Sequence, residues 1–129
     1  MTESLFNKIH HVAIITSDYD QTMEFYVDRL GLTLKNEVFR PEKDDWKIDL
    51  TVGDLELEIF VKPSAPKRES NPEALGLRHL AFQVDDIMQV VAELNQRGIE
   101  TEPVRVDPIT NKRMTFFRDP DDLPIEIHE

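Results

Sequence analysis

The sequence predicts an α+β fold made of two βαβββ modules in tandem. The order strand, helix, strand, strand, strand can be assigned twice along the chain. A proline-rich segment at residues 62–76 separates the two occurrences. Several residues at equivalent places in the two halves are 68 positions apart, as in an internal repeat. We therefore expect a single domain over residues 1–129, with modules at about 8–62 and 76–129.

The first module is expected to begin with a strand at residues 9–16, IHHVAIIT, which is rich in β-branched residues. A helix follows from Ser17 to Gly31, because Ser17 or Asp18 can cap its first turn and Gly31 can adopt the left-handed conformation that ends it. Its apolar face is predicted from spacings of three, four and seven residues and consists of Met23, Tyr26, Val27 and Leu30.

Three further strands are expected in this module, at about 33–39, 46–52 and 55–61. Gly53 and Asp54 separate the last two and form a two-residue hairpin signal, in which glycine supplies a positive φ. Strand alternation places Glu58 on one face with Glu56 and Phe60, with Leu57 and Ile59 on the other.

The second module repeats this order. A strand is predicted at residues 77–84, and Asp85 or Asp86 caps a helix that ends at Gly98. The apolar positions of that helix are Ile87, Val90, Val91 and Leu94. Strands follow at about 104–106, 112–118 and 124–128. The pairs that keep the 68-residue offset are His11 with His79, Ala13 with Ala81, Asp18 with Asp86, and Gln21 with Gln89.

Composition excludes several classes of function. The 26 acidic residues outnumber the 15 Lys and Arg, which argues against binding to nucleic acids or anionic membranes. The absence of cysteine excludes disulfides and thiolate ligands. The start MTESLFNKIHH does not resemble a signal peptide, and no apolar run is long enough to span a membrane. A cytoplasmic location is expected.

Four residues form a candidate metal site. Glu58 and Glu126 are also 68 residues apart, and each follows its histidine, His11 or His79, by 47 residues. Two imidazoles and two carboxylates around one point suit a first-row divalent ion and leave positions for water or substrate. The alternative interpretation is structural, because a lone strand histidine is often a satisfied core residue and the chain has 13 Glu.

Motifs in both halves give the chain a family resemblance. IHHVAI, EFYVDRLGL, LELEIF, LRHLAFQVDD and FFRDPDDLPIEIHE resemble segments of the glyoxalase / bleomycin-resistance / extradiol-dioxygenase superfamily, also called vicinal oxygen chelate proteins. The resemblance implies curved mixed sheets around a metal cleft and places the family's four ligand positions at His11, Glu58, His79 and Glu126. It favours His11 over its neighbour His10, which strand alternation directs to the opposite face.

Within the superfamily, the chain is similar to short bacterial glyoxalase I-like (lactoylglutathione lyase-like) proteins. The resemblance therefore implies a lyase or isomerase acting on the hemithioacetal of a 2-oxoaldehyde and a thiol. Glu126 is the expected catalytic base, with Glu58 as the alternative. The metal is expected to be Ni, Co or Zn, with Mn or Fe also compatible with these ligands. A homodimer is expected, in which the site is either shared between subunits or built within one chain.

Other activities of the superfamily remain as alternatives. An epimerase of this type usually carries Gln where Glu58 stands, and a ring-cleaving dioxygenase uses two histidines and one carboxylate. A thiol transferase uses three ligands. A drug-binding protein of the bleomycin-resistance type lacks the metal residues.

Contacts to the substrate are expected from Trp46, Lys62, Lys112 and Arg113. The alternatives are core packing for Trp46 and simple solvation for the basic pair. His128 shares a strand face with Glu126 and is either a group beside the ligand or an exposed terminal residue.

In glyoxalase I an arginine follows the first ligand and an asparagine follows the second, and both help to bind glutathione. The corresponding residues here are Ile15 and Lys62, so glutathione is expected to be a poor co-substrate.

Overall fold

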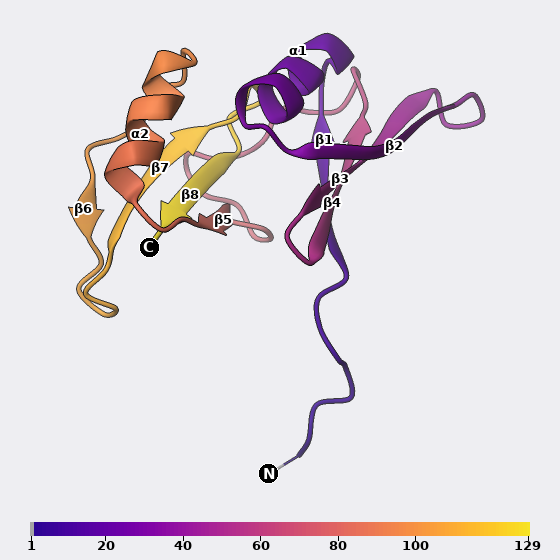
Figure 1. Ribbon diagram of the computed structural model, residues 1–129. Helices are drawn as coiled ribbons and strands as arrows, with labels where there is room; N and C mark the ends of the chain where they lie inside the picture. Colours follow the sequence, from indigo (N-terminus) through magenta and orange to yellow (C-terminus); the bar gives the residue numbers. More distant parts are fainter. Residues whose placement is uncertain (1) are drawn as a thin grey trace. The chain divides into compact units, whose positions relative to one another are not determined.

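The computed structural model describes residues 2–129. The chain forms two compact units, Met1–Ala65 and Pro66–Glu129. Each unit contains a four-stranded mixed sheet and helical segments (Figure 1). The predicted α+β class and the repeated βαβββ order are confirmed.

The first unit contains β1 (His11–Thr16), α1 (Tyr19–Met23), a π-helical segment (Glu24–Arg29), β2 (Thr33–Arg40), β3 (Asp45–Val52) and β4 (Leu55–Val61). The strand order is β1-β4-β3-β2, with β1 and β4 parallel and the other pairs antiparallel. Gly53 has a φ of 55° in the two-residue turn between β3 and β4, as the hairpin signal predicted.

The helix of the first unit differs from the expected single α-helix. Asp18 caps it by accepting a hydrogen bond from the backbone N–H of Gln21. The chain then widens into a π-helix, in which the N–H of Leu30 donates to the carbonyl of Phe25. The buried residues of these two segments are Thr22, Phe25 and Tyr26. Of the predicted apolar face, Met23, Val27 and Leu30 are only half-buried.

The second unit contains β5 (Leu80–Gln83), α2 (Ile87–Gln96), β6 (Arg105–Val106), β7 (Arg113–Arg118) and β8 (Pro124–His128). Its strand order, β5-β8-β7-β6, repeats that of the first unit. Asp86 caps α2 by accepting from the N–H groups of Met88 and Gln89. Gly98 ends the helix with a φ of 83°.

Each sheet has one face that carries the core and one open face. In the first unit the core residues of β3 and β4 are Ile48, Leu50, Leu57, Ile59 and Val61, all at most 4% exposed. In the second unit α2 lies against its sheet (Figure 1), and Ile87 and Leu94 are buried together with Phe117, Ile125 and Ile127 of β7 and β8. The residues between these core positions lie on the open face, where the polar candidates are found.

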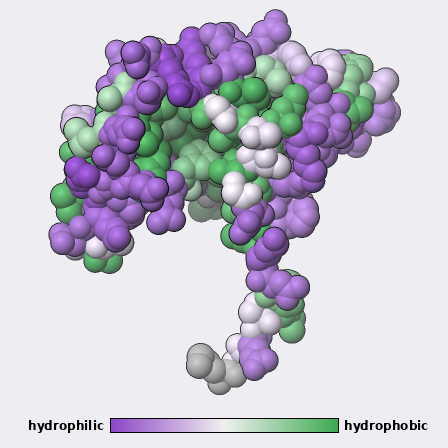
Figure 2. Space-filling view, viewed as in Figure 1, coloured by the Kyte–Doolittle hydropathy of each residue, from purple (hydrophilic) through white to green (hydrophobic). Residues whose placement is uncertain are grey.

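Residues 2–10 extend away from the first sheet, and both apolar and polar side chains are exposed along them (Figure 2). Leu5 and Phe6 are 88% and 79% exposed. No helix within residues 2–129 has the length and apolar character needed to cross a membrane.

Candidate metal centre

His11 and Glu58 lie together on the open face of the first sheet. The Nε2 atom of His11 is 3.6 Å from Oε2 of Glu58, and the two side chains are 40% and 17% exposed. Parallel pairing of β1 with β4 sets this contact, because Ala13 is the register partner of Glu58 and His11 precedes it by two residues on the same face.

His79 and Glu126 form the corresponding pair in the second unit. Nε2 of His79 is 3.2 Å from Oε1 of Glu126. Ala81 is the register partner of Glu126 in the parallel pairing of β5 with β8, so the arrangement repeats that of the first pair. His79 lies one residue before β5, whereas the sequence predicted it inside the strand.

The distances fit neighbouring ligands of one ion. Donors bonded at about 2.1 Å and separated by 90–110° lie about 3.0–3.4 Å apart. The two observed separations, 3.2 and 3.6 Å, are close to that range. Within residues 2–129 no group of three or more His, Asp or Glu side chains is close enough to hold an ion, so each unit by itself offers two donors.

The two glutamates have different neighbours. Glu58 lies opposite Asp49 in the β3–β4 register, and Nζ of Lys47 is 3.8 Å from Oε2 of Glu58. Glu126 lies opposite Phe116 in the β7–β8 register. The ring of Phe116 also meets His79 edge-on, with centroids 5.1 Å apart. Glu58 therefore has a lysine ammonium group beside it, whereas the ring of Phe116 lies beside the His79–Glu126 pair.

His10 lies beside His11. The two Nδ1 atoms are 3.0 Å apart, and the rings meet edge-on. The expectation that strand alternation separates these rings is wrong, because β1 begins only at His11 and His10 precedes the alternating segment. His10 is also 4.0 Å from Glu56, which forms an ion pair with Lys35.

The structure places Trp46 on the core face of β3, opposite Val61, and not on the face of Glu58. Its ring contacts those of Tyr19 and Phe39, with centroids 4.8 and 5.5 Å away. The structure therefore does not bring Trp46 to the His11–Glu58 pair.

Lys62 lies on the open face, where its ammonium group is 2.7 Å from Asp45. Arg40 donates two hydrogen bonds to the same carboxylate and covers the ring of Phe60 at 4.9 Å. These hydrogen bonds, first that from Arg40 and then that from Lys62, hold the pKa of the Asp45 carboxyl well below its usual range.

Arg113 points away from the His79–Glu126 pair. It donates two hydrogen bonds to Glu129, which also accepts one from the N–H of Ile87 at the start of α2. Lys112 lies exposed in the connection from β6 to β7. His128 shares the face of Glu126, and its Nε2 is 3.4 Å from Asp107. A backbone hydrogen bond at Glu129 is the main cause of a raised pKa at His128, and Asp107 adds to it.

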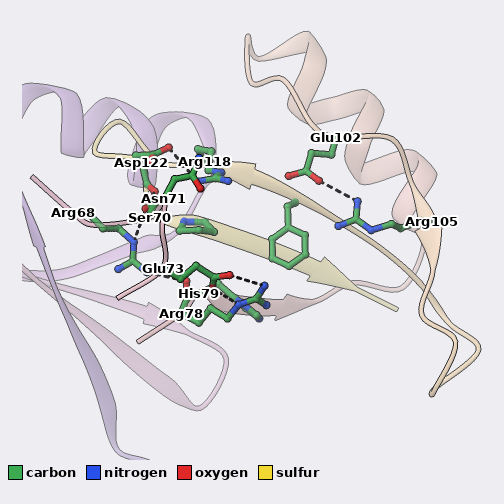
Figure 3. A pocket seen from close by; sticks show the side chains of 12 residues that line it. Arg68, Ser70, Asn71, Glu73, Arg78, His79, Glu102, Arg105, Arg118 and Asp122 are labelled. Atoms are coloured by element: carbon green, nitrogen blue, oxygen red, sulfur yellow. Dashed lines mark hydrogen bonds and ion pairs between the residues drawn. The ribbon is translucent and has the colours of Figure 1, made fainter. Parts of the chain in front are cut away.

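A cavity of about 580 Å³ lies beside His79 within the second unit (Figure 3). Arg105 and Arg118 line it, and the sequence argument missed both. The available signal was strand alternation, which puts Phe116 and Arg118 on the face of Glu126. Arg105 had no such signal, because β6 has only two residues.

The chain is similar to known proteins over nearly its whole length. Residues 8–127 match the family model of the Glyoxalase/Bleomycin resistance protein/Dioxygenase superfamily. Uncharacterized protein YaeR of Escherichia coli is 52% identical, covering 95% of each chain. Uncharacterized protein YwkD of Bacillus subtilis is 50% identical, covering 97% of this chain and 98% of its own. A glyoxalase family protein from Enterococcus faecalis has a similar crystal structure, with a TM-score of 0.93, 58% identity, and coverage of 98% and 100%.

More distant relatives have named activities. Human mitochondrial methylmalonyl-CoA epimerase is 26% identical over 95% of this chain and 73% of its own. Metallothiol transferase FosB of Staphylococcus epidermidis is 24% identical over 93% and 80%.

Proposed function

Because the chain belongs to the Glyoxalase/Bleomycin resistance protein/Dioxygenase superfamily, we propose that it is a metal-dependent isomerase or lyase of the glyoxalase I type. Its substrate is the hemithioacetal that a 2-oxoaldehyde forms with a thiol. The observation that carries this proposal is the repeated His–Glu pair, which has the same register in both sheets.

His11, Glu58, His79 and Glu126 are the proposed ligands of one divalent ion. Two imidazole nitrogens and two carboxylate oxygens suit Ni, Co or Zn, and also accept Mn or Fe. The short N–O separation inside each pair supports this set, since neither pair needs to rearrange to offer both donors to one ion. When bound, the ion supplies Lewis-acid polarisation of the substrate oxygens.

Glu126 is the proposed base. It takes the proton from one substrate carbon and returns it to the adjacent carbon. The hydroxyl proton of the first carbon moves to the oxygen of the second, so the hemithioacetal becomes a 2-hydroxy thioester. Its different surroundings support this assignment over Glu58. The ammonium group of Lys47, 3.8 Å away, attracts the carboxylate of Glu58 and favours a fixed position. The neighbour of Glu126 across the strands is the ring of Phe116, which forms no such ion pair.

Epimerisation beside a thioester is the second candidate. Epimerisation also requires removal and return of a proton next to a carbonyl. Human mitochondrial methylmalonyl-CoA epimerase, which is 26% identical to this chain, is named for such a reaction. The retained Glu58 favours the glyoxalase I type, because epimerases of this kind usually carry Gln there. Turnover of a methylglyoxal hemithioacetal, compared with proton exchange in an acyl-thioester, separates the two.

Metal content and turnover test the proposal. Loss of a residue that hydrogen-bonds to a metal ligand weakens metal binding about 10–100-fold. We expect His11→Gln and His79→Gln, which remove a ligand itself, to weaken it more than that. Glu56→Gln, two residues before Glu58 on β4, is the matched control and should bind metal as the wild type does. Glu126→Gln should bind metal more weakly, through its amide oxygen, and lose turnover even at saturating metal. Unchanged turnover would exclude Glu126 as the base. A protein that stays metal-free in excess Ni, Co, Zn and Mn would disprove the proposal.

A further inference from the structure

The cavity beside His79 is rich in arginine. Four guanidinium groups line it, although the chain as a whole carries a net charge of −11. Figure 3 shows Arg78, Arg105 and Arg118 around His79, each beside an acidic partner. Arg68 differs from these three, because its guanidinium group donates to the carbonyls of Leu77 and Arg78 and so holds the backbone before β5.

Arg105 and His79 both contact the ring of Phe116. Its guanidinium carbon lies 5.5 Å from the ring centroid of Phe116, and that centroid is 5.1 Å from the centroid of His79. The two distances together set an upper limit on the separation of the Arg105 guanidinium carbon from the centre of the His79 imidazole. A cation over an aromatic face is attracted to it, so Phe116 favours one position for Arg105.

The acidic partners of these arginines are exposed. Arg105 pairs with Glu102 at 3.1 Å, with 50% and 44% of the two side chains exposed, and Arg118 pairs with Asp122 at 3.2 Å, with 47% and 61% exposed. Exposed ion pairs of this kind contribute little free energy and are screened by salt. When an anion enters the cavity, an arginine therefore exchanges a weak ion pair for a contact with that anion. The planar guanidinium group is suited to a bidentate contact of this kind.

From this arrangement we propose that the second unit binds the anionic group of a small substrate, a carboxylate or a phosphate, at Arg105, while the reacting carbons lie near His79. The inference rests on the proposed function for its second half, since it assumes that chemistry takes place beside His79. Arg118 lies two residues beyond Phe116 on the same strand face and adds a second cation to the cavity.

The cavity also limits the class of substrate. At about 580 Å³ it has the size of a site for a small metabolite. Its apolar lining includes Phe116 and Pro124, so it offers little surface to a long hydrocarbon chain. The expected substrate is therefore a compact molecule that carries an acidic group.

Binding of two simple anions to metal-free protein tests this inference. The full chain, passed over a chelating resin, is titrated calorimetrically with inorganic phosphate and, separately, with succinate. We expect saturable binding of one of them with a Kd of about 1 mM. Arg105→Gln should weaken it about ten- to a hundredfold, and Arg105→Lys should restore part of the loss. The control is Arg97→Gln at the C-cap of α2, which removes an arginine with 46% exposure and an ion pair to Glu93 and should leave anion binding unchanged.

The outcomes separate the two proposals. Binding that Arg105→Gln weakens and Arg97→Gln does not would support the anion site even if the protein has no isomerase activity, and preference for phosphate or succinate identifies the acidic group. Absence of saturable binding to both anions, or equal binding by wild type and Arg105→Gln with matching melting curves, would overturn the inference. The proposed isomerase activity would then still be tested separately, by the variants at the metal ligands.

Discussion

The ammonium group of Lys62 lies 2.7 Å from a carboxylate oxygen of Asp45, a side chain with no exposed surface. Arg40, at the end of β2, donates to both oxygens of the same carboxylate. Asp45 therefore connects the ends of β2, β3 and the segment after β4 on the open face of the first sheet.

Asp45→Asn should destabilise the protein. The amide cannot match the charge of two cations, and Arg40 and Lys62, only 26% and 37% exposed, would lose their partner. We expect the melting temperature at neutral pH to be lower by on the order of 5 °C or more. Asp44→Asn, at an exposed neighbour with a φ of 52°, is the control and should melt as the wild type does. An unchanged melting temperature for Asp45→Asn would show that this carboxylate stabilises nothing.

The lowered pKa of Glu129 predicts that the stability of the fold depends on pH. Hydrogen bonds from Arg113 and then from the N–H of Ile87 lower the pKa of Glu129 to about 2. A carboxyl with a lowered pKa stabilises the fold above its unfolded value, about 4.3, and loses that contribution as the pH falls toward the folded value. The melting temperatures of wild type and Glu129→Gln should therefore differ at pH 7 and converge between about pH 4 and pH 2. A difference that persists unchanged at pH 2 would contradict this origin.

Much of the fold was predictable because hydrophobic alternation and turn residues determine it locally. Gly53 and Gly98 have the positive φ values that their places required, and Asp18 and Asp86 cap their helices. The π-helical segment was not predictable, since the spacing of apolar residues does not distinguish its wider hydrogen bond, from the N–H of Leu30 to the carbonyl of Phe25, from those of an α-helix.

The candidate site was predictable only in part. Each His–Glu contact follows from a repeat in the sequence combined with parallel pairing of the first and last strands. The partners of Lys62 and Arg113 were not predictable, because long charged side chains choose among several nearby acids. Arg105 was missed because its contact with Phe116 depends on how a two-residue strand pairs with β7.

A shared site in a homodimer can be tested by mixing two inactive variants. If His11 and Glu58 of one subunit act with His79 and Glu126 of the other, a heterodimer of His11→Gln/Glu58→Gln and His79→Gln/Glu126→Gln has one intact site. Random exchange makes about half of the dimers mixed, so about a quarter of the wild-type activity should return. Activity that stays absent after exchange has been demonstrated would place all four ligands in one chain.

The choice of thiol depends on two positions on the open face of the first sheet. Ile15, on β1, is 56% exposed and offers no hydrogen bond to a carboxylate. The ammonium group of Lys62 lies 2.7 Å from Asp45 and is held by that carboxylate. Neither residue replaces the arginine and asparagine that help to hold glutathione in glyoxalase I.

We therefore expect glutathione to be a poor co-substrate. Loss of one hydrogen bond to a charged group costs roughly 1.5–3 kcal/mol, which is about one to two orders of magnitude in binding. The measurement is kcat/KM for methylglyoxal hemithioacetals made with glutathione and with small acidic thiols, which carry a carboxylate for Arg105 without a peptide. Ile15→Arg should raise kcat/KM with glutathione mainly through KM, and Ile15→Gln, which adds no charge, is its control. A wild-type value with glutathione at or above about 10⁶ M⁻¹ s⁻¹ would show that other residues of the chain bind the peptide.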